Sequence, residues 1–303
     1  MKKKINYGRQ YIDKLDANLV IKSLKENLIT TGNYVNLFEK KIRDKFKLFS
    51  FFLSDTTTVF TTKGLRKLFD NLMRLTLGTA NFLKNYSLIQ KDNLNSLYKK
   101  KLILKAKILG IKFIDTSPSY GKAEKIIGKT GVKIFKIITK IPKLPKSKTN
   151  NISDWILKNL KNSLKNFNQK KIYGLLIHNK SDFMNNKKNY LEAFNIIKRK
   201  DLVEKIGVSL YEAKDLNKIV KYWKPDIVQI PYNIIDRRIQ NKKFINVIKK
   251  NRIELHVRSI FLKGMLVNQK VYPLSLNKWK KKVNYWFKWC KDKKLKPFIV
   301  AFL

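Results

Sequence analysis

The chain has 303 residues, of which 44% are apolar, so it can bury a sizeable core in one large or two ordinary domains and is not a disordered protein. Lys and Arg outnumber Asp and Glu by 68 to 21, but they are spread from end to end, which indicates a solvated basic surface rather than a specific nucleic-acid site. The single cysteine cannot form an intrachain disulfide, and two histidines with one cysteine argue against a dedicated metal site. The sequence contains no signal-like or bilayer-spanning apolar run, so we expect a cytoplasmic protein.

Residues 1–47 are predicted to form a helix, a turn and a second helix. Asp16 can cap the first helix, "TTGN" interrupts the pattern, and apolar residues then recur at helical spacing. This segment contains no catalytic motif. Residues 48–73 have no clear period and are interpreted as a junction.

From residue 74 onward, short runs rich in Ile and Val alternate with Lys-rich amphipathic segments such as 153–167 and 189–203. Unbroken apolar strands joined by helices are typical of a parallel sheet that is covered on both faces. We therefore predict an α/β fold of the TIM (β/α)8-barrel type, and no G-x-G-x-x-G motif supports a doubly wound alternative. The predicted strands are 74–80, 111–117, 133–140, 171–179, 205–210, 226–233 and 253–261.

Polar residues stand at the ends of several predicted strands. "FID" ends in Asp115, "IITK" in Lys140 and "LLIH" in His178, while Gln229 lies in "VQ" and Tyr120 follows Asp115 by five residues. The carboxyl ends of parallel barrel strands meet at one rim, so we expect these side chains to converge there. Taken alone, Asp115 could cap the following helix or loop, and His178 could be a core residue. Because several polar residues stand at the ends of successive strands, a shared site is the better interpretation.

These residue types fit proton transfer to a carbonyl. A tyrosine, with a reference pKa of about 10, is a poor acid near neutral pH, and a nearby Lys140 ammonium would favour its release of a proton. Asp115 would hold the lysine protonated, and His178 could hydrogen-bond the oxygen that is being reduced. Such a set would need only a source of hydride.

With "GTANF", "IDTSPSYG", "IITKIP", "LLIHN" and "IGVS" in this order, residues 74–303 resemble the aldo/keto reductases. The resemblance implies a TIM barrel that uses NADPH to reduce a small-molecule carbonyl, with Tyr120 as proton donor beside Asp115, Lys140 and His178. It also implies that Ser209 and Gln229 hold the carboxamide of the nicotinamide.

The chain departs from the family pattern at several points. Leu210 follows Ser209 where the family usually has Asn, and Arg258 stands where the family often has a tyrosine that stacks on the nicotinamide. Arg258 could stack in the same way, bind an anionic group or form a surface salt bridge. The chain ends at "KPFIVAFL", within the expected seventh helix, so the eighth strand is expected to be missing and the barrel open.

Residues 1–47 resemble the N-terminal arm of the sugar aminotransferases that use pyridoxal phosphate to make amino sugars for surface polysaccharides. "SDTTTVF" then falls at the place of that family's phosphate-binding loop, with Asp55 in place of glycine. The combination indicates a fusion of two pieces, with an ordinary helical extension as the alternative for residues 1–47, and it suggests a keto- or aldehyde-sugar as the substrate of the reductase part. The alternative hypothesis is an inactive, truncated fusion product that binds polyanions through its basic surface.

Overall fold

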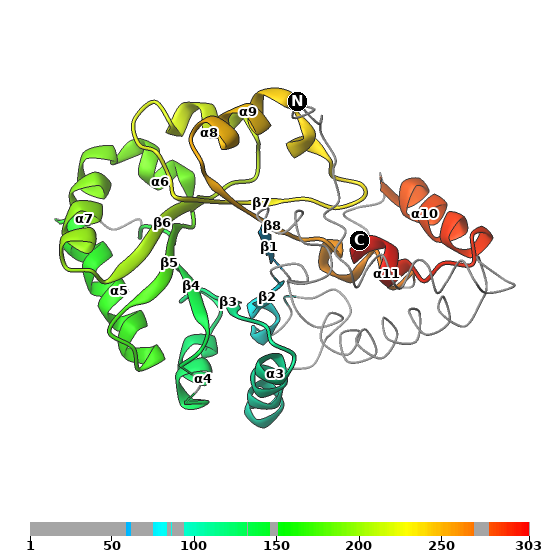
Figure 1. Ribbon diagram of the computed structural model, residues 1–303, viewed down its shortest axis with the longest axis horizontal. Coiled ribbons are helices and arrows are strands. Elements are labelled where there is room, and N and C mark those ends of the chain that lie inside the picture. Colours follow the sequence, from blue (N-terminus) through cyan, green and yellow to red (C-terminus); the bar gives the residue numbers. More distant parts are fainter. Residues whose placement is uncertain are drawn as a thin grey trace, which may run out of the picture.

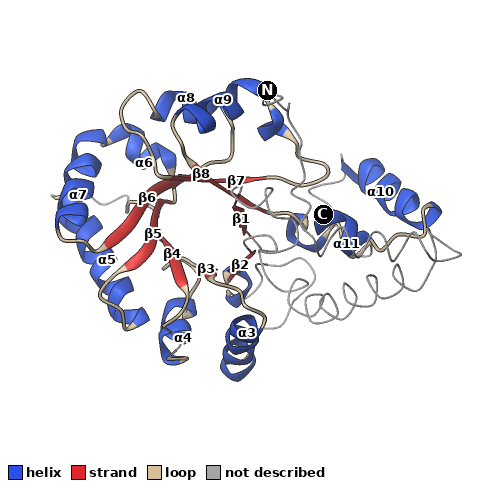
Figure 2. Ribbon diagram, in the orientation of Figure 1, coloured by secondary structure: helices blue, strands red, loops and turns tan. Residues whose placement is uncertain are grey.

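A curled sheet of parallel strands forms the centre of the computed structural model, and helices lie around its outer side (Figures 1 and 2). The structure describes residues 59–61, 75–83, 86, 94–131, 133–145, 151–269 and 279–302. The parallel strands, each hydrogen-bonded to the next in chain order, are β2 (Leu75–Gly78), β3 (Phe113–Asp115), β4 (Lys136–Ile141), β5 (Ile172–Ile177), β6 (Val203–Ser209), β7 (Ile227–Pro231) and β8 (Glu254–Arg258). These strands confirm the predicted ones and the expected barrel-type arrangement.

A short additional strand, β1 (Val59–Thr61), lies between the two edges of this sheet. It pairs antiparallel with β2 and with β8, so the strands form a closed ring. The expectation of an open sheet is corrected by this pairing, because a piece of the predicted junction supplies backbone partners to both edges. An eighth parallel strand is not found among the described residues. The two predicted N-terminal helices, in residues 1–47, lie outside the described part of the chain.

Asparagine side chains begin several of the helices. The side-chain oxygens of Asn95, Asn151, Asn179 and Asn241 each accept a hydrogen bond from a backbone N–H in the first turn of α3, α5, α6 and α9, the usual N-cap arrangement. The α-helices are α3 (Ser96–Ile108), α4 (Ala123–Lys129), α5 (Ile152–Phe167), α6 (Lys180–Asn185), α7 (Lys187–Arg199), α8 (Lys214–Ile219), α9 (Lys242–Lys250), α10 (Lys280–Asp292) and α11 (Pro297–Phe302). Short 3-10 turns are η2 (Ala80–Phe82), η3 (Arg238–Gln240) and η4 (Leu262–Gly264).

The two predicted amphipathic segments correspond to α5 and α7. The second one ends earlier than predicted, at Arg199, because Asp201 adopts a positive φ of 49° and Val203 begins β6. None of the helices in the described ranges is long and apolar enough to cross a membrane.

Side chains along the strands alternate between two cores. Ile114, Ile137, Leu175 and Val228 belong to the large core between the sheet and the helices. A second, smaller cluster contains their sequence neighbours Phe113, Ile138, Leu176 and Ile227, together with Tyr173. Because successive strand residues point to opposite faces, this second cluster fills the inside of the barrel.

Polar side chains lie next to this interior cluster. Glu254 accepts hydrogen bonds from the Tyr173 hydroxyl (2.7 Å to Oε2) and from His256 (Nε2 to Oε1, 2.8 Å), and it is paired with Lys205. His256 is fully buried, and the Tyr173 ring packs edge-on against Phe113. The carboxylate of Glu254 therefore ties together β5, β6 and β8 inside the ring.

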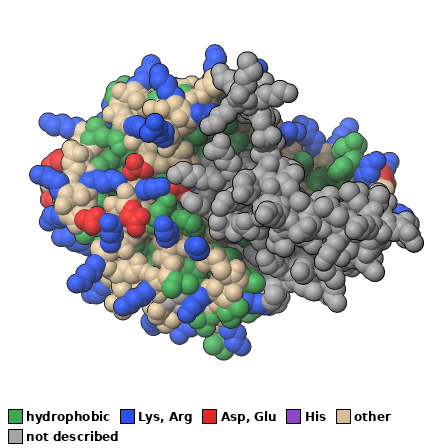
Figure 3. All heavy atoms as spheres, viewed as in Figure 1, with side chains coloured by type: hydrophobic (Ala, Val, Ile, Leu, Met, Phe, Trp, Pro, Cys, Tyr) green, Lys and Arg blue, Asp and Glu red, His purple; other side chains and the backbone are tan. Residues whose placement is uncertain are grey.

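The basic side chains are distributed over the surface. Lys and Arg side chains are scattered across the described part of the face shown in Figure 3, and they do not gather in one stripe there. This distribution agrees with the interpretation of the charge as a generally solvated surface.

Candidate active site

Four of the predicted site residues lie on the interior face of the barrel, two positions nearer the carboxyl end of their strands than the interior apolar cluster. Side chains two residues apart on a strand share a face, so each residue that follows an interior apolar residue by two positions also points inward. These pairs are Phe113 and Asp115, Ile138 and Lys140, Leu176 and His178, and Ile227 and Gln229. The strand pattern thus carries the polar residues to the carboxyl rim, where active sites of such barrels lie.

A buried ion pair forms the base of the site. Lys140 Nζ donates to both carboxylate oxygens of Asp115, at 2.8 and 2.9 Å, and to the backbone carbonyl of Thr116 at 2.8 Å. These bonds use all three donors of an ammonium group. Gln229 Nε2 also donates to Asp115 Oδ1 at 2.8 Å. Burial lowers the pKa of Lys140, and the adjacent carboxylate of Asp115 opposes that shift.

Tyr120 lies above this pair, in the loop between β3 and α4. Lys140 Nζ is 5.1 Å from the centroid of the Tyr120 ring, and the ring is half-buried. Burial, followed by the charge of Asp115, raises the pKa of Tyr120 well above its usual value. The expected lowering of this pKa by Lys140 is therefore not seen, because desolvation dominates and the charge of Asp115 acts in the same direction as desolvation. The phenol is held in its protonated, proton-donating form.

His178 follows β5 and faces the same tyrosine, with the two rings perpendicular and their centroids 6.2 Å apart. Burial, assisted by the charge of Lys140, lowers the pKa of His178 to about 4, so the imidazole is neutral near pH 7. The Ser117 hydroxyl accepts from the N–H of Ser119 and lies 3.5 Å from His178 Nδ1. A serine proton directed at Nδ1 leaves Nε2 as the N–H donor of the ring.

Ser209 and Gln229, the residues expected to hold the nicotinamide, stand side by side. They are paired in the register of β6 and β7, and both are buried. The amide of Gln229 donates to Asp115, while its buried Oε1 has no partner among the described residues. A free buried acceptor beside a serine is suited to the NH₂ of a carboxamide, so the residues present fit a nicotinamide.

Arg258 ends β8 at the same rim and is half-buried. Its guanidinium lies over the ring of Tyr211, with Cζ 4.4 Å from the centroid, and it donates to the carbonyl of Leu210 (3.2 Å) and to the hydroxyl of Ser259 (3.3 Å). Its charge acts on Tyr120, as one of the causes that lower the pKa of that phenol. The structure thus brings Arg258 to the site, together with the other six predicted residues.

Four further residues take part in the site that the sequence analysis did not assign to it. They are Tyr86, whose ring centroid is 6.3 Å from that of Tyr120, the Thr116 carbonyl, Ser117 and Tyr211. Thr116 and Ser117 lie inside the "IDTSPSYG" motif, so their proximity to Asp115 was a usable signal. Tyr86 and Tyr211 belong to no motif, and only the folded chain brings them to the rim.

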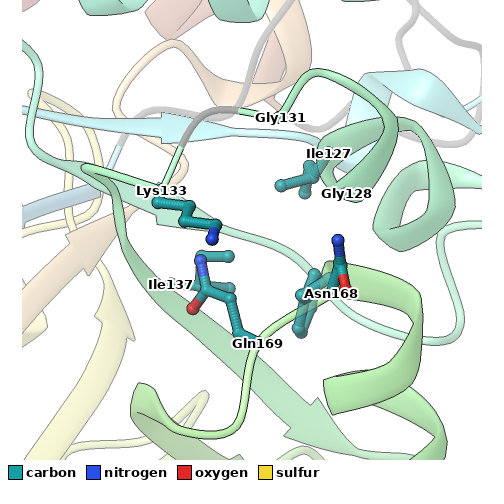
Figure 4. A pocket seen from close by; sticks show the side chains of 8 residues that line it. Ile127, Gly128, Gly131, Lys133, Ile137, Asn168 and Gln169 are labelled. Carbon is teal, nitrogen blue, oxygen red and sulfur yellow. The ribbon is translucent and has the colours of Figure 1, made fainter.

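A small hollow lies elsewhere, between α4, α5 and the start of β4 (Figure 4). Its volume is about 20 Å³, enough for about one water molecule, and its lining includes Gly128, Lys133, Asn168 and Gln169. It opens near the beginning of the strands, away from the carboxyl rim. Within the described ranges, no group of three or more His, Cys, Asp or Glu side chains could hold a metal ion.

A barrel whose rim carries a protonated tyrosine, a lysine–aspartate pair and a neutral histidine is arranged for reduction of a carbonyl with an external hydride. The chain belongs to the aldo/keto reductase family, since the model of the Aldo/keto reductase family matches residues 74–302. It is therefore an oxidoreductase of the NAD(P)-dependent, carbonyl-reducing type. No curated protein matches the chain.

Solved structures share the fold at low sequence identity. Glycerol dehydrogenase from Gluconobacter oxydans is 18% identical, with 82% of each chain covered and a TM-score of 0.57. A candidate aldo-keto reductase from Pseudomonas aeruginosa is 20% identical, with 65% of this chain and 74% of that chain covered and a TM-score of 0.51. An aldo-keto reductase from Bacillus halodurans in its holo form is also 20% identical, with 59% and 62% covered and a TM-score of 0.50.

Proposed function

We propose that the chain reduces an aldehyde or ketone to an alcohol with NADPH, and that Tyr120 is the proton donor. The supporting observation is the stack of Tyr120 over the buried Lys140 and Asp115 pair, with the neutral His178 facing the same phenol. When bound, the nicotinamide supplies the hydride. The carbonyl carbon gains that hydride and the oxygen gains one proton, which balances the reaction.

Each residue of the site has a distinct role in this proposal. Tyr120, which is protonated at neutral pH, releases its O–H proton to the carbonyl oxygen, and the positive charge of Lys140 offsets the raised pKa of the phenol as the proton leaves. His178 directs Nε2–H at the same oxygen and so orients the substrate. Asp115 fixes Lys140 through both carboxylate oxygens, which holds one positive charge beneath the phenol when a phenolate forms.

Ser209 and Gln229 are proposed to hold the carboxamide, since their polar groups meet on neighbouring strands and Gln229 Oε1 has no described partner. Arg258 is proposed as the third residue that borders the cofactor, because it takes the place of the family's stacking tyrosine. The choice of NADPH over NADH is supported by the family resemblance alone. A keto- or aldehyde-sugar as substrate is supported by the resemblance of residues 1–47 to sugar aminotransferases.

A titration of NADPH into the purified full chain, followed by nicotinamide fluorescence in moderate salt, tests this function first. We expect saturable one-to-one binding, tighter than that of NADH, and consumption of NADPH when aldehydes, ketones and keto-sugars are added. Moderate salt screens non-specific attraction to the basic surface. A folded chain that neither binds NADPH nor consumes it would refute the reductase and favour the inactive basic binding protein.

A further inference from the structure

The side chains at the carboxyl rim leave positive charge uncompensated. Lys140 and Asp115 neutralise each other, Tyr120 is protonated and His178 is neutral near pH 7. Arg258 is an additional charge at this rim, and among the described residues no carboxylate forms an ion pair with it. A second cation, Lys263, lies at the outer edge, with its Nζ 5.3 Å from the centroid of the Tyr86 ring. The site therefore has an excess of positive charge facing the place where a substrate would bind.

Arg258 is held so that some of its donors stay available. One face of its guanidinium lies on Tyr211, and its NH1 and NH2 atoms make one hydrogen bond each, to Ser259 Oγ and Leu210 O. A guanidinium has five N–H donors, so three have no acceptor among the described residues. The charge of Arg258 also lowers the pKa of Asp236, but the carboxylate of Asp236 forms its ion pair with Arg238.

We propose that Arg258 is an anion-binding residue of the substrate subsite, so that the carbonyl compound reduced here carries a carboxylate or phosphate group. This inference rests on the proposed reductase function and names its substrate class. A planar guanidinium, fixed by stacking on Tyr211, matches the two oxygens of such a group better than a lysine would.

The position of Arg258 favours an anion on the substrate over one on the cofactor. Arg258 follows the register partner of Gln229 on β8 by two positions, so it lies on the same interior face at the rim. Its charge also acts on the pKa of Tyr120, Lys140 and His178. The phosphates of a nicotinamide dinucleotide lie beyond the ribose, at least one sugar ring away from the reacting carbon. A carboxylate or phosphate close to the carbonyl is therefore the better match.

The test compares charged and neutral aldehydes of the same shape, in the wild type and in Arg258→Met. The pairs are 4-carboxybenzaldehyde with 4-methylbenzaldehyde, and glyceraldehyde 3-phosphate with glyceraldehyde, so that a carboxylate and a phosphate are examined separately. We expect Arg258→Met to lower kcat/KM for the preferred anionic aldehyde by about 10- to 100-fold, mainly through KM. For its neutral counterpart we expect a clearly smaller loss, because that aldehyde shares only the contact between Arg258 and the cofactor.

Two control variants distinguish an anion subsite at Arg258 from a general effect on the proposed reductase activity. Arg199→Met removes one exposed positive charge from the end of α7, and it should leave both substrates unaffected. Arg258→Lys keeps the charge and should recover part of the loss. Equal losses on charged and neutral aldehydes, or weaker NADPH binding without any change in discrimination, would overturn the substrate role of Arg258.

Binding without turnover gives an independent readout. Benzoate and benzamide are compared as ligands of the full chain by saturation-transfer NMR, with and without Arg258→Met. Benzoate that binds the wild type but not the variant supports the anion subsite even if no carbonyl is reduced, in which case only the reductase function fails. Turnover without any preference for anions keeps the reductase function and refutes the subsite.

Discussion

Burial reinforces the uncharged state of two polar side chains that face the rim. It raises the pKa of Tyr120 and lowers the pKa of His178 to about 4, so both groups are uncharged near pH 7 and His178 stays so well below it. Both then carry a proton that can be directed at a carbonyl oxygen. Two neutral hydrogen-bond donors, Tyr120 and His178, beside the fixed ion pair of Lys140 and Asp115 suit the protonation of a carbonyl oxygen during its reduction.

Replacing Tyr120 by Phe removes the proton donor and little volume. We expect kcat to fall by about 10²–10⁴-fold, because general acid catalysis contributes an effect of that order. NADPH affinity, measured by nicotinamide fluorescence, should stay nearly unchanged. Tyr222→Phe, at an exposed tyrosine after α8, is the matched control and should keep full turnover. Equal turnover in Tyr120→Phe would remove Tyr120 from the role.

His178 should stay neutral well below the usual histidine pKa. The chain has only two histidines, so NMR signals of the imidazoles can be assigned with single variants. Between its folded pKa of about 4 and an unfolded value of about 6.5, the unfolded chain binds more protons, so this contribution to stability exists above pH 6.5 and decreases as pH falls. A His178 titration centred near pH 6.5 would contradict the buried, neutral ring.

At the scale of elements, Gly207 lets β6 and β7 approach closely, and Gly174 on β5 serves as the comparison. A Cβ on Gly207 would lie 2.2 Å from the backbone oxygen of Ile227, whereas a Cβ on Gly174 would meet only side-chain atoms, at 3.1 Å or more. Gly207→Ala should therefore destabilise the fold by about 2–3 kcal/mol in denaturant unfolding, and Gly174→Ala by less than about 1 kcal/mol. Equal losses would show that the β6 and β7 contact can relax.

The carboxylate of Glu254 links three strands, and its removal should show in acid unfolding. Burial raises the pKa of Glu254, but hydrogen bonds from His256, Lys205 and Tyr173 outweigh burial and lower it. The stabilising contribution is present above about pH 4.3 and is lost as pH falls through the folded pKa. Glu254→Gln should cost about 2 kcal/mol at pH 7 and weaken the pH dependence below that point.

The control for Glu254 is the exposed pair of Lys171 and Asp201, 2.6 Å apart. Asp201→Asn should change the free energy of unfolding by less than about 1 kcal/mol, since exposed ion pairs contribute little. An equally small change in Glu254→Gln would mean that the network inside the barrel does not stabilise the fold.

Sequence patterns located the elements better than the contacts between them. Parallel strands that are buried on both faces are unbroken apolar runs, which is why the seven strands were predicted. β1 was not predicted, because its three residues are too few to show the alternation of apolar and polar residues that indicates a strand. Arg258 and Tyr211 meet only because the ends of β6 and β8 flank β7, and the raised pKa of Tyr120 depends on burial in the finished fold.

At the scale of the whole molecule, the net positive charge lowers the stability of the folded state. With 68 basic and 21 acidic side chains, the net charge of +47 makes the compact state repel itself. On the described part of the face in Figure 3 the Lys and Arg side chains are dispersed, so the repulsion there is not confined to one patch. Salt should therefore stabilise this protein, in contrast to one that depends on exposed ion pairs.

Raising NaCl from about 10 mM to about 150 mM shortens the Debye length from about 30 Å to about 8 Å, which screens most of the repulsion between distant cations. We expect the melting temperature of the full chain to rise by about 2–5 °C, measured by calorimetry. Sucrose at matched osmolality controls for excluded-solute effects, and Arg258→Met shows whether chloride acts at the rim instead. A melting temperature that falls with salt would mean that the ion pairs, although fewer, outweigh the repulsion. An identical rise in Arg258→Met would place the effect on the surface as a whole, because that variant removes the rim charge to which an anion is proposed to bind.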